Sequence, residues 1–323
     1  MNKYVSLVKA HYPNSLRNPR SIDQVKAYEI NSRNFKIVSD SGSFLLKEFL
    51  TTRNASKILK IVHRCFLDEA KVPEIIKTAK GKLSVKTDGK IYCLFAYHEG
   101  RKFDGTIQQI REAGKNLAIL HNSLKKQEYK IEENPAYRLL AEKEFLGIQG
   151  MLDMKKRKNK FDFSVMKMLK NFKELSTDNK TQLEGQGLPK QMIHGDFHPG
   201  NTVFKGDKLM TILDFGNMHF SERIKDVAFS CHRFTRHTPS PLHSMTDFLC
   251  SYRSESELSS KEVDSIPHFI VREALRRISY ILRSHYFEDC KTWDFELRKH
   301  LGILEEAKDL GKEFWHAGTV QLP

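Results

Sequence analysis

The sequence predicts an α+β protein with a small β-rich part over residues 1–97 and a larger, mainly helical part over residues 98–323. Short runs rich in β-branched and aromatic residues gather in the first part, and apolar residues at helical spacing dominate the second. A chain of 323 residues, of which 39% are hydrophobic and 29% charged, is long enough to bury a core in two lobes.

The N-terminal part opens with three strand-like runs, at residues 24–30, 35–38 and 43–49. The third run is apolar apart from its charged positions and carries Lys47 before a helix. The turn between the first two runs, residues 31–34, contains small polar residues and no glycine. We therefore expect three strands, joined first by a turn without a flexible backbone.

A helix and a hairpin complete the N-terminal part. Residues 54–68 predict the helix, because apolar residues recur on one face, at Ile58, Leu59, Val62 and Phe66. Two strand-like runs at 83–87 and 90–97 flank an Asp-Gly pair, which is typical of a tight hairpin turn. A second helix is expected over residues 106–126, where an apolar stripe repeats at helical spacing.

The most informative motif is His-Gly-Asp-Phe-His-Pro-Gly-Asn at residues 194–201, followed by Leu-Asp-Phe-Gly at residues 213–216. Asp196 and Asn201 are separated by four residues, as in the catalytic loop of protein kinases. There, the aspartate accepts the proton of the acceptor hydroxyl and the asparagine holds a magnesium ion. The motif therefore indicates phosphoryl transfer.

The chain between the two halves of this motif predicts a β-hairpin. Strand-like runs at residues 202–205 and 208–213 flank a Gly-Asp turn. Because an antiparallel hairpin returns the chain to its starting level, we expect Asn201 and Asp214 to be neighbours. One amide oxygen, one carboxylate and the phosphates of ATP would suit Mg²⁺, which prefers oxygen ligands and keeps several waters.

The His-Gly-Asp-x-x-x-x-Asn pattern with its following Leu-Asp resembles the aminoglycoside phosphotransferase and choline kinase family, which acts on small molecules. The resemblance spans about residues 20–310 and is specific over residues 192–217. It implies a bilobal protein-kinase-like fold, with ATP and Mg²⁺ as cofactors. It also implies that Asp196 is the catalytic base and that Asn201 and Asp214 are the metal ligands.

The same resemblance implies that the N-terminal lobe covers ATP. Lys47 resembles the strand lysine that contacts the α- and β-phosphates, although a solvated lysine on a half-exposed strand is the alternative. Phe95, Ala96 and Tyr97 resemble the segment between the lobes that binds adenine, although an ordinary sheet edge would look the same. The turn at residues 31–34 departs from the family by lacking the glycines of a phosphate-covering loop.

A second departure concerns the partner of Lys47. The helix predicted at residues 54–68 has no acidic residue in its first half, where the family usually places the glutamate that pairs with the lysine. Asp68 and Glu69 lie late in the segment, so the sequence assigns no partner.

Other polar residues near the motif are expected to be structural. No further His or Cys follows His194 and His198 at zinc-ligand spacing, so both are expected to shape the loop through hydrogen bonds. We expect His121 to be a packed, hydrogen-bonded histidine. Asp226 is expected to cap a helix or to brace the catalytic loop.

The remaining segments would frame the acceptor site. Residues 127–188 match the helical insertion that the family often has, and the basic run at residues 155–160 predicts a solvated loop within it. Amphipathic helices are expected at residues 266–285 and 293–312, where they would close the substrate cleft.

The composition favours a cytoplasmic protein without a membrane partner. The five cysteines are scattered and form no Cys-x-x-Cys pair, which favours a reducing compartment. No apolar run approaches the ~20 residues of a membrane helix, and the N-terminus is too polar for a signal sequence. Net charge alone suggests a nucleic-acid partner, but no nucleic-acid-binding motif is present, so this partner is disfavoured.

The net charge of +14, from 54 basic and 40 acidic residues, bears on the acceptor. Polycationic aminoglycosides need an acidic cleft, so they are disfavoured. A choline-type acceptor would need an aromatic cage, although helix packing is the commoner role of the four candidates, Tyr286, Phe287, Trp293 and Trp315. A neutral or anionic metabolite fits best, such as a sugar, an amino sugar or a hydroxy amino acid. Acidic side chains lining the cleft would contradict this expectation.

The sequence thus predicts an ATP-dependent small-molecule kinase that transfers the γ-phosphoryl group to an alcohol hydroxyl. Two alternatives stay open: an aminoglycoside or choline kinase, and a kinase-like ATP-binding or structural protein without turnover, like the spore-coat proteins of this superfamily. The sequence does not determine the oligomeric state.

Overall fold

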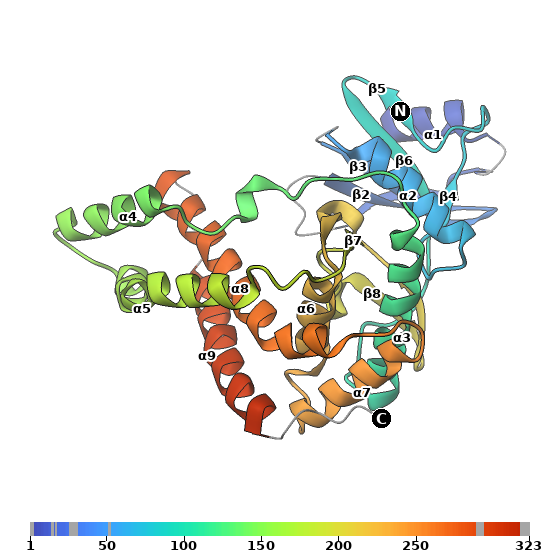
Figure 1. Ribbon diagram of the computed structural model, residues 1–323. Helices are drawn as coiled ribbons and strands as arrows, with labels where there is room; N and C mark the ends of the chain where they lie inside the picture. The colour runs from blue at the N-terminus through green and yellow to red at the C-terminus, as the bar shows by residue number, and fades with distance from the viewer. Residues whose placement is uncertain are drawn as a thin grey trace.

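The chain folds into an N-terminal β-sheet with two helices and a larger helical part (Figure 1), so the expected α+β class is confirmed. The boundary at residue 97 stays a prediction. None of the helices in the described part of the chain is long and apolar enough to cross a membrane. The computed structural model describes residues 3–13, 16, 18–25, 32–50, 53–288 and 294–316.

The N-terminal sheet is antiparallel, with strand order β1-β2-β3-β6-β4 and with β5 also paired to β6. Helices α1 and α2 cover its two faces. The elements of this part are α1 (Lys3–His11), β1 (Ser21–Val25), β2 (Ser32–Ser39), β3 (Gly42–Phe49), α2 (Ala55–Leu67), β4 (Ile75–Ile76), β5 (Val85–Thr87) and β6 (Lys90–Ala96).

The start of the sheet corrects one expectation from the sequence. The turn placed at residues 31–34 was wrong, because Arg33 pairs with Glu48, and Asn34 with Lys47, inside the β2–β3 ladder. Pairing with a neighbouring strand has overridden the turn preference of Ser and Asn. The strand expected at residues 24–30 is described only up to Val25, and the rest of that segment lies outside the described residues.

Alternation along β3 sends adjacent side chains to opposite faces of the sheet. Leu46 and Glu48 face α1, where Glu48 is fully buried and accepts hydrogen bonds from Tyr4 and Lys90, at 3.0 and 2.6 Å. Lys47 faces the other way, toward the second part of the molecule. Glu48, although adjacent in sequence, is therefore not the partner of Lys47.

In the C-terminal part, α3 and α6 pack against the strands beside the motif, α7 and α8 pack on these helices, and α9 packs on α8. The α4 and α5 helices project from this part as a pair (Figure 1). The predicted helices and hairpins are confirmed with small shifts at their ends, and the basic run forms the loop between α4 and α5. The helices are α3 (Ile107–Lys125), α4 (Glu142–Met154), α5 (Lys160–Leu183), α6 (Arg223–Thr235), α7 (Pro241–Arg253), α8 (Ser260–Phe287) and α9 (Asp294–His316). The strands are β7 (Lys190–Ile193), β8 (Thr202–Lys205), β9 (Lys208–Ile212) and β10 (His219–Glu222).

Close packing of α3 on α7 depends on Gly114. A Cβ atom at this position would lie 2.3 Å from the carbonyl oxygen of Phe248, which is a backbone atom and cannot rotate away. One large core joins these helices to α2 and β6, so a shift of α3 would also disturb the junction between the two parts.

We expect Gly114→Ala to lower the free energy of unfolding by about 2 kcal/mol, because the overlap with α7 outweighs the better helix propensity of alanine. Urea denaturation followed by circular dichroism would measure it. Gly150→Ala in α4 is the matched control: its Cβ would meet nothing within 4 Å, so it should stabilise the protein by about 0.5–1 kcal/mol. Equal stabilisation by both changes would contradict the close approach of α3 and α7.

Candidate active site

A sharp turn after β7 presents Asp196. His194 follows the last strand residue, Ile193, and Gly195 adopts a φ of +77°. A Cβ on Gly195 would lie 2.4 Å from the carbonyl oxygen of Asn217, so the turn requires glycine both for its conformation and for its space. This geometry explains the Gly that precedes the Asp in the motif.

The carboxylate of Asp226 fixes this turn through hydrogen bonds to its backbone. It accepts hydrogen bonds from the backbone N–H groups of His194 (2.8 Å) and Gly195 (3.0 Å), and it lies 3.1 Å from Nε2 of His121. Burial raises the pKa of Asp226, but these contacts outweigh it and hold the pKa below its usual value. The expected brace is confirmed, as is the structural role of His121, which also bonds the Tyr252 hydroxyl. Asp226 lies inside α6, so the expectation of a helix cap was wrong.

The two histidines of the motif shape the loop, as expected. His194 Nε2 lies 3.0 Å from the carbonyl oxygen of Leu213, and its Nδ1 accepts the N–H of Asp196. His198 Nδ1 accepts the N–H of Gly200 at 3.0 Å. Burial lowers the pKa of His198 to about 4, so this side chain is neutral at pH 7.

The hairpin of β8 and β9 brings its two ends together, as its sequence predicted. The N–H of Leu213 donates to the carbonyl oxygen of Asn201 at 2.8 Å, which places Asp214 beside Asn201. The side-chain nitrogen of Asn201 donates to the backbone oxygen of Asp196 at 2.9 Å. The side-chain oxygen of Asn201 is therefore left to accept a hydrogen bond or to bind a metal. Asp214 itself adopts a left-handed conformation, with φ +59°.

This donor set fits Mg²⁺. A carboxylate and an amide oxygen lie at adjacent positions, and the phosphates of a nucleotide would supply further oxygen ligands. Within the described ranges there is no cluster of three or more His, Cys, Asp or Glu that could hold a metal by itself. The metal-binding roles of Asn201 and Asp214 remain predictions.

Lys47 joins the two parts of the molecule at this point. Its Nζ lies 3.3 Å from Oδ1 of Asp214, and its side chain is 12% exposed, so it is not a solvated lysine. Burial raises the pKa of Asp214, but Lys47 and the N–H of Gly216 hold that pKa below its usual value. Asp68 is engaged elsewhere, by the hydroxyl of Ser123 at 2.8 Å, and is not the partner that the sequence left unassigned.

A cavity of about 630 Å³ opens beside these residues. Asp196, Asp214 and Lys47 line one side, and α8 and the segment before α4 line the other. The α9 helix contributes no lining residue among those described. Contrary to the expectation from net charge, acidic side chains lie in the wall, together with basic ones: Glu132, Glu133, Glu273, Glu288, Arg53, Arg276 and Arg277.

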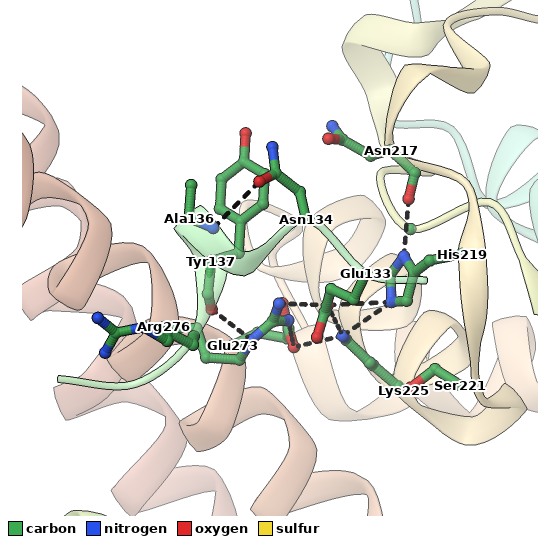
Figure 2. A network of polar contacts seen from close by, with 12 residues as sticks. Glu133, Asn134, Ala136, Tyr137, Asn217, His219, Ser221, Lys225, Glu273 and Arg276 are labelled. Atoms are coloured by element: carbon green, nitrogen blue, oxygen red, sulfur yellow. Dashed lines mark hydrogen bonds and ion pairs between the residues drawn. The ribbon is translucent and has the colours of Figure 1, made fainter. Parts of the chain in front are cut away.

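Two of the four glutamates in this wall, Glu133 and Glu273, are paired with cations in a network that Figure 2 shows. Glu133 contacts Lys225, Arg276 and Nε2 of His219. Glu273 contacts the same Arg276, and Lys225 at 3.6 Å. Burial raises the pKa of Glu133 and of Glu273, but the surrounding cations outweigh it and lower both, that of Glu273 to about 2. The cavity therefore combines charges of both signs.

A second cavity of about 840 Å³ lies beside the segment expected to bind adenine, between Tyr97 and β8. The N–H groups of Ala96 and Tyr97 already donate to the carbonyls of Glu74 and Ser43, at 2.9 and 3.2 Å, and Phe95 is buried in the sheet. Tyr97 and three residues that follow it, Glu99, Gly100 and Arg101, line this cavity. Adenine contacts at Phe95, Ala96 and Tyr97 remain predictions.

The aromatic cage considered for a choline-type acceptor is not formed by the candidates that the structure describes. Tyr286 packs on Phe161 and donates to Asp162 at 3.3 Å, away from the cavity. Phe287 lies against Gly147. The side chains of Trp293 and Trp315 lie outside the described residues.

Residues of the opposite wall were not found from the sequence. Oδ1 of Asp196 accepts a hydrogen bond from Arg277 at 3.1 Å, and its Oδ2 faces the amide nitrogens of Asn201 and Asn217, both at 3.4 Å. Tyr137 stacks over Arg277 with 5.0 Å between guanidinium and ring centroid. The only signal in the sequence was the Arg-Arg pair inside the apolar helix at residues 266–285.

Comparison with known proteins gives relatives of one kind. A homoserine kinase of Zymomonas mobilis is 26% identical over 196 residues, or 58% of this chain and 56% of that protein. A homoserine kinase of Sinorhizobium medicae is 23% identical over 257 residues, or 76% of this chain and 74% of that protein. The chain thus matches little more than half the length of the first relative.

Solved structures share the fold. A spectinomycin phosphotransferase bound to ADP and spectinomycin aligns with a TM-score of 0.70 at 16% identity, covering 94% of this chain and 93% of the other. A microcompartment-associated aminopropanol kinase aligns with a TM-score of 0.66 at 13% identity, covering 99% and 100%. The bilobal kinase-like fold is therefore confirmed.

The family model described as "Phosphotransferase enzyme family" matches residues 27–256, which include the catalytic loop, the hairpin and Lys47. This chain belongs to the phosphotransferase enzyme family, whose members include small-molecule kinases with a hydroxyl acceptor.

Proposed function

We propose that the protein transfers the γ-phosphoryl group of MgATP to an alcohol hydroxyl of a small metabolite. The observation that carries the proposal is the convergence of Asp196, Asn201, Asp214 and Lys47 at one end of a cavity. A protein that only binds nucleotide would not need Asp196 to face the space where an acceptor fits.

Each residue then has a role that follows from its position. Asp196 orients the acceptor hydroxyl and takes its proton as the oxygen attacks the γ-phosphorus, while ADP leaves. Asn201 and Asp214 would hold the magnesium ion, which neutralises charge on the phosphates when it is bound. Lys47, freed from part of its contact with Asp214, would meet the α- and β-phosphates. Most of the acceleration would come from positioning and electrostatics.

The acceptor that fits the cavity best is a hydroxy amino acid. Charges of both signs in the wall suit a zwitterion better than a sugar or a purely anionic metabolite. The names of the relatives, homoserine kinases, support the same class. We therefore propose homoserine or a similar hydroxy amino acid as the acceptor, and the cytoplasm, where ATP is available, as the place of the reaction.

We expect Asp196→Asn to lower turnover about 10²- to 10⁴-fold while MgATP binding survives, because the amide cannot accept the proton. Asp214→Ala should instead weaken binding of the magnesium–nucleotide complex. ADP release and calorimetric titration with MgATP would separate the two effects. Asp207→Asn, at the tip of the same hairpin, is the matched control and should change neither. Full turnover in Asp196→Asn would contradict the role of the base.

We expect Asp226→Asn to lower both stability and turnover, because an amide cannot accept all the N–H groups that now face the carboxylate. The free energy of unfolding should fall by about 3 kcal/mol, and kcat should fall more than the affinity for MgATP. Denaturation and steady-state kinetics would measure both. Asp153→Asn, on the exposed side of α4, removes the same charge and should change neither by much. A stable, fully active Asp226→Asn protein would refute the brace.

A further inference from the structure

Both oxygens of the catalytic carboxylate face donors before any substrate arrives. Arg277 donates to Oδ1 of Asp196 at 3.1 Å, and the amides of Asn201 and Asn217 lie 3.4 Å from Oδ2. A general base must bring one oxygen within hydrogen-bond distance of the hydroxyl it deprotonates. An acceptor hydroxyl that approaches Oδ1, the oxygen with the shorter contact, must therefore displace Arg277 or share this oxygen with it.

Displacing Arg277 without compensation is costly. Its guanidinium stays charged at any physiological pH, and its side chain is only 26% exposed. Removing an arginine from a carboxylate in such a site leaves a poorly solvated charge on each partner. An anionic group on the acceptor would remove this cost, because the guanidinium could exchange one carboxylate for another.

The neighbouring side chains leave Arg277 able to make that exchange. Arg276 is committed to Glu133, Glu273 and the carbonyl oxygen of Tyr137. Arg277 also lines the cavity, and Tyr137 stacks over it with 5.0 Å between guanidinium and ring centroid, which orients the guanidinium while leaving its edge to donate. Two N–H groups of its planar guanidinium can donate side by side to the two oxygens of a carboxylate, which the ammonium group of a lysine cannot do.

We propose that Arg277 binds the carboxylate of the acceptor, and that this contact frees Asp196 to receive the hydroxyl. The inference rests on the proposed function and deepens it, because it makes Arg277 the residue that selects hydroxy acids over amino alcohols of the same length. An acceptor without a carboxylate leaves Arg277 on the base and is a poor substrate.

Two pairs of acceptors that differ only in the carboxylate provide the test. L-homoserine is compared with 3-amino-1-propanol, and L-serine with ethanolamine, by MgATP-dependent ADP release. The wild-type protein should prefer the carboxylated member of at least one pair. In Arg277→Gln the ratio of kcat/KM within that pair should fall about 100-fold, mainly through a higher KM for the hydroxy acid.

Two further variants control this test. Arg272→Gln removes the same charge from the same helix, where the described contact of Arg272 is with the ring of Phe269, and should keep the wild-type ratio. Arg277→Lys keeps the charge but not the paired donors, so it should recover only part of the preference. Thermal denaturation of each variant would show that the fold is retained. A purely structural ion pair would lower the activity on both members of a pair equally.

A binding measurement tests the role of Arg277 separately from the proposed kinase activity. If no acceptor supports turnover, the kinase proposal fails. Calorimetric titration of L-homoserine or L-serine in the presence of Mg²⁺ and AMP-PNP then decides about Arg277 alone. Binding to the wild-type protein that is lost in Arg277→Gln supports the inference. Turnover confined to amino alcohols or sugars, a ratio unchanged in Arg277→Gln, or no binding of either hydroxy acid overturns it.

Discussion

The site depends on one buried carboxylate, that of Asp226. A fully buried charge is stable only where donors surround it, and these donors are two backbone N–H groups of the catalytic loop and a histidine of α3. The loop is therefore fixed where it leaves β7. A chain of contacts extends from this loop to the N-terminal sheet. The side chain of Asn201 donates to the backbone oxygen of Asp196, the carbonyl of Asn201 accepts from Leu213, and the next residue, Asp214, pairs with Lys47.

The parts of this arrangement that were predictable from the sequence are those separated by few residues. The loop, the hairpin and its two ends all lie between residues 194 and 214, and hairpin geometry brings the ends together without information from elsewhere. Four helices, α2, α3, α8 and α9, were predictable from the spacing of their apolar residues. The turn at residues 31–34 was not, because pairing with a strand overruled the local preference of Ser and Asn.

The opposite wall of the cavity could not be predicted for a different reason. Glu133 and Arg277 are more than 140 positions apart, and neither belongs to a motif. Net charge was also a poor guide to this wall. The chain carries an excess of 14 positive charges, yet the wall pairs carboxylates with cations inside one network. Net charge describes the field around the whole molecule, whereas binding depends on which charges remain exposed within the cavity.

Consecutive residues of a helix point about 100° apart, so Arg276 and Arg277 serve different neighbours. Arg276 is bonded to Glu273 of the same helix and to Glu133, which ties α8 to the segment before α4, whereas Arg277 reaches the carboxylate of Asp196. Because α8 also packs against α6, which carries Asp226, this wall of the cavity and the loop that carries Asp196 are supported by the same pair of helices. A change in this network would therefore disturb the cavity wall and the loop that carries Asp196 together.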